Sequence, residues 1–387
     1  MKKLLTFALC LTLLVGCLSV LTACNDNQTT TSAQKDPGFT YELVSGATEE
    51  ESYLVVTGYN VSDEVNELVS QQNFSDEKVK AVSKIEIPTG NVEYKRNGQV
   101  VGSYPVKEID ESAFANMLFI KEVVIPENIE TIGSACLAGC TNLEKLTVNF
   151  VGNKKDGNVN AKKTLGYLFG TQEVTNATSS TVKYNASGSA TYYIPNSLKT
   201  IVLTGDTVGE YAFNGFTNVE EIVLPETVLE YGAYAFANCS SLYKFAIGAN
   251  VTKIGDNAFS GCTSLVNPNF ADATSLTYIG DSAFSGCTQL FYSVSGGVYT
   301  ASANLTYIGA QAFANCTALE EVSLLGLTTA TVGDGAFSGC ENVTKVTLPV
   351  DATNISYGSL VFTGCNVKKE NVVNYVNNYL FDFDYDV

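Results

Sequence analysis

The sequence predicts an α/β repeat solenoid in which each repeat of about 23 residues supplies one short parallel strand. The first observation behind this prediction is a phrase, Ala-Phe-x-x-Cys, which recurs so that Phe213, Phe236 and Phe259 are each 23 residues apart. The second is a set of apolar residues that follows each copy of the phrase at fixed spacing. A unit this short cannot bury a core alone, so the copies must stack on one another.

The phrase is clearest in the second half of the chain and altered toward both ends. Its clearest copies begin at Ala212, Ala235, Ala258, Ala283, Ala312 and Ala336. Rougher copies begin at Ala113, Cys136 and Val361, and such divergence is expected of capping units. Later phenylalanines are 24 to 29 residues apart, so extra residues should loop out from a fixed core.

A strand and a turn follow each copy. After Cys316 the apolar residues are Leu319, Val322 and Leu324, and the last two share one side of a strand. Proline ends several strands because it brings no N–H to a ladder. A Val-x-x-Ile-Gly turn, as at residues 251–255, comes next, with glycine favoured at a sharp corner. The Ala-Phe segment then forms the opposite wall, in a turn or a short helical piece.

This pattern resembles the BspA-type leucine-rich repeat family of bacterial surface proteins over residues 106–365. The resemblance implies a right-handed, curved leucine-rich-repeat solenoid, an exported location, and a role in adhesion to host proteins or other cells. Residues 149–197 depart from the pattern, since they are rich in Asn, Thr, Ser, Gly and Lys. An irregular or insertion-bearing coil is expected there.

The N-terminal sequence has the pattern of an export signal. Lys2 and Lys3 precede an apolar run at residues 4–21, and small residues follow, which is typical of a secretory signal peptide over residues 1–23. The segment Leu21-Thr22-Ala23-Cys24 resembles the lipobox of bacterial lipoproteins. That likeness implies cleavage before Cys24 and a lipid on its sulfur. Cys17 is a rival attachment site, and an uncleaved anchor helix is a further alternative.

Three further segments flank the repeats. Residues 24–38 lack periodic apolar residues and read as a flexible tether. Residues 39–105 form an N-terminal capping region, with strands expected at 53–56 and 85–87 and a helix at 63–82. Residues 366–387 form a C-terminal cap, where alternation at 381–386 suits an edge strand. The same carboxylates could bind calcium, although no glycine turn or glutamate ligand follows.

The charge and composition of the chain limit the classes of ligand and the kinds of chemistry that are expected. A formal net charge of −18 disfavours nucleic acid and anionic lipid, and favours basic ligands or host proteins. The chain has no histidine, which removes the commonest general base and metal ligand. No catalytic motif is found, so the protein is expected to be non-enzymatic, without metal or cofactor.

Eight cysteines follow Cys24, and six of them take the same position in successive coils. Met117 and Phe216 stand at that position in other copies, so the site demands an apolar side chain rather than a bond. A ladder of buried thiols is therefore favoured over disulfides. Zinc is disfavoured because paired CxxC spacing is lacking.

The concave face that solenoid curvature creates is the expected binding surface. Charges on it recur one coil apart and should attract each other, so their first role is structural. A second candidate is the longest repeat, whose aromatic residues would meet solvent or pack back on their own coil. The candidate ligand-binding residues are Glu122, Lys145, Glu221, Val223, Lys244, Glu321, Ser323 and Lys345 on the strands, and Phe291, Tyr292 and Tyr299 in the long repeat.

Two functions follow from these features. The first is a non-enzymatic adhesion or protein-recognition lipoprotein, anchored to the cell membrane by lipid alone and exposed at the surface, which binds host or neighbouring-cell proteins or glycans. The alternative is a structural or ligand-capturing envelope lipoprotein, for example a transporter-associated binding component.

Overall fold

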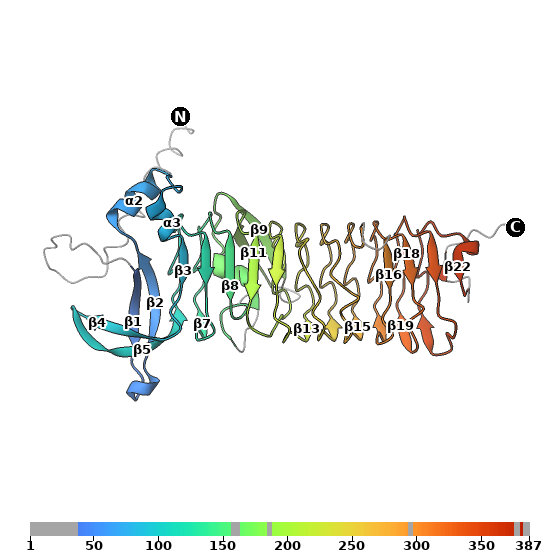
Figure 1. Ribbon diagram of the computed structural model, residues 1–387, viewed down its shortest axis with the longest axis horizontal. Coiled ribbons are helices and arrows are strands. Elements are labelled where there is room, and N and C mark those ends of the chain that lie inside the picture. The colour runs from blue at the N-terminus through green and yellow to red at the C-terminus, as the bar shows by residue number, and fades with distance from the viewer. Residues whose placement is uncertain (1–37, 156–162, 184–187, 293–296, 375–379, 382–387) are drawn as a thin grey trace. The chain divides into compact units, whose positions relative to one another are not determined.

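The computed structural model describes residues 38–155, 163–183, 188–292, 297–374 and 380–381 (Figure 1). Pro37–Val387 form one compact unit, which is described by itself. The expected signal peptide, the tether up to residue 37, the lipid site at Cys24 and the alternation beyond residue 381 lie outside the described residues.

The described coils form a parallel β-solenoid, as predicted (Figure 1). One column of strands, here called the strand column, comes from the segment that follows each core phrase. Its first sheet contains β3 (Lys84–Glu86), β6 (Glu122–Val124), β8 (Lys145–Val148), β11 (Thr200–Leu203) and β12 (Glu221–Val223). Its second sheet contains β16 (Val298–Thr300), β18 (Glu321–Ser323), β20 (Lys345–Thr347) and β22 (Val372–Val373).

A second column of short parallel strands lies at the Val-x-x-Ile-Gly segments. The sequence predicted one strand per coil, and the structure adds this one: β13 (Glu230–Tyr231), β14 (Lys253–Ile254), β15 (Tyr278–Ile279), β17 (Tyr307–Ile308), β19 (Ala330–Val332) and β21 (Ile355–Tyr357). The clear Ala-Phe segments are turns rather than helices.

The N-terminal region joins the coils through β-sheet pairing. Its strands are β1 (Gly38–Val44), β2 (Tyr53–Asn60), β4 (Asn91–Arg96) and β5 (Gln99–Ile109). β5 runs parallel to β7 (Thr131–Ile132), and β3 runs parallel to β6. The helix expected at 63–82 is two helices, α2 (Asp63–Ser70) and α3 (Glu77–Ala81). Within the irregular stretch, β9 (Ala177–Lys183) and β10 (Ser189–Pro195) form an antiparallel pair after a 3-10 turn at Leu165–Phe169.

A column of stacked phenylalanines fills the core beneath the Ala-Phe turns. The ring of Phe259 lies 4.8 Å from that of Phe236 and 5.1 Å from that of Phe284, nearly parallel to both. Offset stacking of this kind adds about 0.5–1.5 kcal/mol per pair to the burial of apolar area. Phe381 stacks on Phe362 at 5.1 Å, which extends the column by one ring beyond the last copy of the phrase.

The eight described cysteines are free thiols, which confirms the predicted thiol ladder. The thiol of Cys262 donates to the carbonyl oxygen of Phe236 in the preceding coil at 3.1 Å, and Cys239 does the same to Phe213. Burial raises the pKa of Cys239 to about 12, so the thiol stays protonated at neutral pH. The cysteine therefore fills the core and also bonds one coil to the next.

The glycine after each isoleucine is required by close approach. A Cβ added to Gly255 would lie 2.7 Å from the backbone nitrogen of Ala233 in the preceding coil, and one on Gly280 would lie 2.6 Å from that of Asp256. Neither glycine has positive φ. The sequence interpretation named the right residue for a different reason: successive coils pack too tightly here for any side chain.

Candidate functional site

The outward side of the strand column, here called the strand face, carries ion pairs between neighbouring coils. Glu122 forms an ion pair with Lys145 at 3.4 Å, and Glu321 accepts a hydrogen bond from Lys345 at 2.8 Å. In both pairs the residues are register partners on adjacent parallel strands. Ser323 lies on the same face, half-buried beside this second pair. These charges neutralise each other within the fold.

The third pair of charges expected on the strand face does not form an ion pair in the coils that the structure describes. Glu221 and Lys244 are backbone partners in an isolated bridge, but no ion pair joins their side chains in the described structure. The ammonium group of Lys244 instead lies 5.6 Å from the centre of the Tyr243 ring. Val223, beside Glu221, is 43% exposed. At this coil, therefore, the opposite charges on the strand face no longer form an ion pair.

The ladder of the strand column stops after β12 and resumes at β16. In the coils between them, residues 245–247 and 267–270 are not strands. Pro268 stands where other coils place an inward-facing aliphatic residue such as Val322, and proline has no N–H for the ladder. Phe245 occupies that position one coil earlier, and its ring packs 5.0 Å from that of Phe259. A proline and a bulky ring thus accompany the break.

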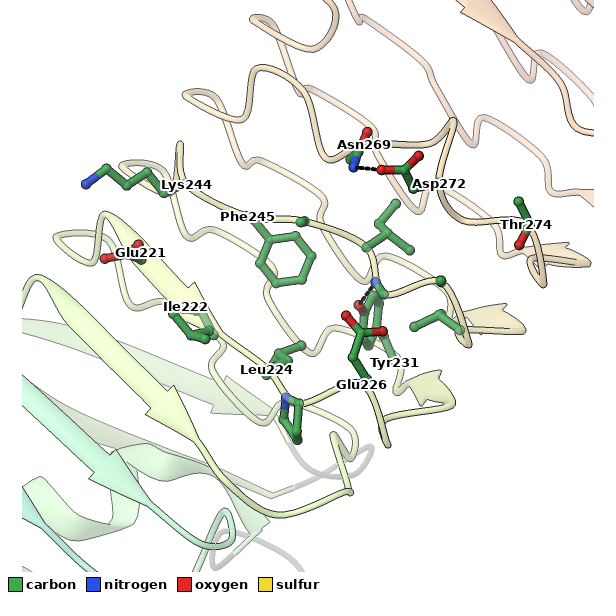
Figure 2. Close-up of a pocket in the computed structure, with 17 residues that line it drawn as sticks. Glu221, Ile222, Leu224, Glu226, Tyr231, Lys244, Phe245, Asn269, Asp272 and Thr274 are labelled. Carbon is green, nitrogen blue, oxygen red and sulfur yellow. Dashed lines mark hydrogen bonds between the residues drawn. The ribbon is translucent and has the colours of Figure 1, made fainter.

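A cleft of about 780 Å³ opens at this break (Figure 2). Residues 221–226 form one wall and residues 244–249 another, while Asn269, Asp272 and Thr274 contribute from the next coil. A second cavity of about 550 Å³ shares Asn269 and Thr274 with it. Ligand sites in proteins commonly enclose about 300–1,000 Å³, so the cleft has room for several side chains.

Backbone groups are left unpaired along the cleft. In regular coils the N–H of Ile125 donates to Thr147 at 2.9 Å, and that of Leu324 donates to Thr347 at 2.8 Å. Among the described residues, the corresponding N–H of Leu224 has no such partner, and neither has the N–H of Ala246. Leu224 is also half-buried, whereas Leu324 is fully buried. The edge of β12 is therefore open, with part of an apolar side chain accessible.

The cleft carries an excess of negative charge. Glu221, Glu226 and Asp272 line it, and none of the three forms an ion pair within the described part of the chain. Lys244 is the one cationic residue among those that line it. Asn269 donates a hydrogen bond from its side-chain amide to Asp272, which orients this carboxylate (Figure 2).

The three aromatic candidates differ in exposure, since two are buried and one is exposed. Phe291 is 5% exposed and Tyr299 is 1% exposed, and their rings lie 5.6 Å apart in the core. Tyr292 alone of the three is exposed. Of the two arrangements expected from the sequence, Phe291 and Tyr299 pack back into the core, and Phe291 also lines the second cavity.

Sequence reasoning placed Glu221, Val223 and Lys244 at this face but missed Leu224, Glu226, Asn269 and Asp272. The signal that could have found them is Pro268, because a proline inside an otherwise regular strand position indicates an interrupted ladder. Among the described residues, no cluster of three or more potential metal-ligating side chains is found.

The family model for the BspA type leucine-rich repeat region matches residues 99–185, 185–299 and 289–384, with six copies. The chain belongs to this family. No curated protein matches the sequence. Within the described residues, no helix has both the length and the hydropathy needed to cross a membrane.

Solved structures similar to the chain are bacterial repeat proteins. A leucine-rich repeat protein from Bacteroides ovatus shares 16% identity, covering 87% of this chain and 94% of that one, with a TM-score of 0.26. A leucine rich cell surface protein from Faecalibacterium prausnitzii shares 16% identity over 92% and 100%, also at 0.26. The pneumococcal vaccine antigen PcpA shares 13% over 89% and 98%, with a TM-score of 0.34. The family assignment rests on the repeats, not on these structures.

Proposed function

We propose that this protein is a non-enzymatic adhesion or recognition lipoprotein, displayed at the cell surface, which binds a host or neighbouring-cell protein through its strand face. The cleft at the interrupted ladder is the observation that carries the proposal. Elsewhere on this face Glu122 and Glu321 are neutralised by lysines of the fold, whereas the cleft offers unpaired carboxylates, open backbone groups and a volume of about 780 Å³. Such a surface can recognise a partner.

Binding of the full chain to extracellular protein tests the proposal. The protein is solubilised in a non-ionic detergent and presented to immobilised matrix proteins and surface glycans, with an unrelated acidic protein of matched charge as control. We expect saturable binding to a protein of the set. If no extracellular partner is enriched, and antibodies on intact cells fail to reach the protein, the adhesion role fails and the envelope alternative takes its place.

The lipid anchor needs a separate test because Cys24 lies outside the described residues. We expect a fatty-acid probe to label the wild-type protein in cells. The Cys24→Ser variant should lose the label and leave the membrane fraction, while Cys17→Ser should keep both. Labelling of Cys24→Ser at the wild-type level would contradict attachment at Cys24.

A further inference from the structure

We propose that the cleft binds an extended, lysine- or arginine-containing peptide segment of a partner protein, which adds as a strand to the open edge of β12. The inference rests on the proposed recognition function and specifies the form of its ligand. Three features carry it: the unpaired backbone at the β12 edge, the apolar side chains exposed beside that edge, and the uncompensated carboxylates around it.

The regular coils satisfy their backbone groups at the position where the edge of β12 is left open. There, strands inside a sheet, such as β8 and β18, are hydrogen-bonded on both sides, and the N–H that follows β18 donates to the next coil, from Leu324 to Thr347 at 2.8 Å. At β12 the pairing with β11 is intact, but on the other side only Glu221 keeps a partner. An extended peptide satisfies such an edge through its own main chain, which is how β-strand addition supplies affinity.

Side chains at the edge favour an extended segment over a helix. Val223 is 43% exposed and points away from the core, while Leu224, on the other side of the strand, is half-buried in the cleft (Figure 2). A strand alternates its side chains between two faces, so successive residues of an added peptide would contact each of these in turn. A helix keeps its N–H groups bonded internally and would leave the edge of β12 unsatisfied.

The negative charge of the cleft favours a peptide with cationic side chains. Glu226 and Asp272 are exposed carboxylates on two walls of the cleft, and Glu221 lies at its start. Lys244 offsets one of these charges, so the lining remains acidic, as does the whole chain at −18. An added cationic side chain reaches a carboxylate without displacing any ion pair of the fold, whereas an acidic peptide would be repelled.

Selection of random peptides about 12 residues long on the full chain in detergent tests the inference. We expect enriched sequences in which lysine or arginine alternates with β-branched residues. Neutralising the cleft with Glu226→Gln and Asp272→Asn should weaken their affinity about tenfold. The matched control, Glu122→Gln with Glu321→Gln, removes the same charge from the regular coils and should change affinity by about twofold at most.

Hydrogen exchange tells strand addition from simple charge attraction. The amides of Leu224 and Ala246 should exchange rapidly in the free protein and become protected when a selected peptide is bound. The same peptide with alternate backbone nitrogens methylated in one register should bind about tenfold more weakly than the version methylated in the other register, because only alternate N–H groups face β12.

Several results would overturn the inference. They are the absence of any enriched peptide, enrichment of acidic or helical peptides, affinity unchanged by the cleft variants, and protection away from residues 222–247. Glycan binding abolished by Glu226→Gln and Asp272→Asn, with no peptide selected, would assign the cleft to a different ligand. If the cleft variants still bind an extracellular protein as tightly as wild type, the proposed function survives and this inference fails.

Discussion

Two stretches of the strand face differ although they share one core. Around β6 and β8, and again around β18 and β20, strands pair on both sides and glutamates pair with lysines. Between β12 and β16 the strand column and its ion pairs stop, while the column of phenylalanines and thiols continues beneath. The Ala-Phe turns and the second column of strands therefore hold the coils together where the strand column is interrupted, and this allows the strand face to open into a cleft.

The largest effect is expected at alkaline pH, which tests the burial of the thiols in that shared column. Burial raises the pKa of Cys140 in a regular coil and of Cys239 beside the cleft, each to about 12, against about 8.5 in an unfolded chain. Because the folded pKa is raised, the stabilisation is full below about pH 8.5 and is lost as pH rises toward 12. We expect the free energy of unfolding to fall by about 1.4 kcal/mol per thiol for each pH unit in that window.

Urea titrations between pH 7 and pH 9 measure this loss, because tyrosine, with an ordinary pKa of about 10, stays mostly protonated in the unfolded chain over that range. Thiol labelling of the native protein supplies the comparison, since Cys140 and Cys239 should react equally slowly. Faster labelling of Cys239 would show that the break in the strands also loosens the core. Stability unchanged up to pH 9 would contradict the burial of the thiols.

The next effect is a cavity in the phenylalanine column. Phe259 stacks between Phe236 and Phe284 and also meets Phe245 at 5.0 Å, so Phe259→Ala removes contacts with the core and with the wall of the cleft. We expect a loss of about 3–5 kcal/mol in the free energy of unfolding. Phe337→Ala, in a regular coil, serves as the matched variant. A cost for Phe259→Ala that is much smaller than for Phe337→Ala would show that the interrupted region is loosely packed.

Sequence pattern predicted the core far better than the site. Phe259 and Cys262 repeat at a fixed spacing because every coil must fill the same interior, and their burial was expected. The second strand column was missed because two-residue strands such as Lys253–Ile254 are too short to show alternation. Glu226 and Asp272 lie in segments with no periodic constraint, so only the break at Pro268 could have pointed to them.

A smaller effect is expected at the coil-to-coil glycines. Gly280→Ala would place a Cβ 2.6 Å from the backbone nitrogen of Asp256, and neither backbone can yield without disturbing β15. We expect a cost of about 1–3 kcal/mol, seen as a lower urea midpoint with an unchanged slope. Gly90→Ala is the control, because open space surrounds that glycine in the described structure. Equal stability of the two variants would mean that the coils are not packed this tightly.

The smallest effect addresses the strand face itself. A double-mutant cycle on Glu321 and Lys345, joined at 2.8 Å and about half exposed, should give a coupling of about 0.2–1 kcal/mol that fades in high salt. The same cycle on Glu221 and Lys244, which form no ion pair, should give about zero. Chemical denaturation of the alanine variants measures both couplings under one set of conditions. Equal couplings would erase the difference between the regular coils and the cleft, because Lys244 would then neutralise Glu221 and leave less charge for a cationic partner.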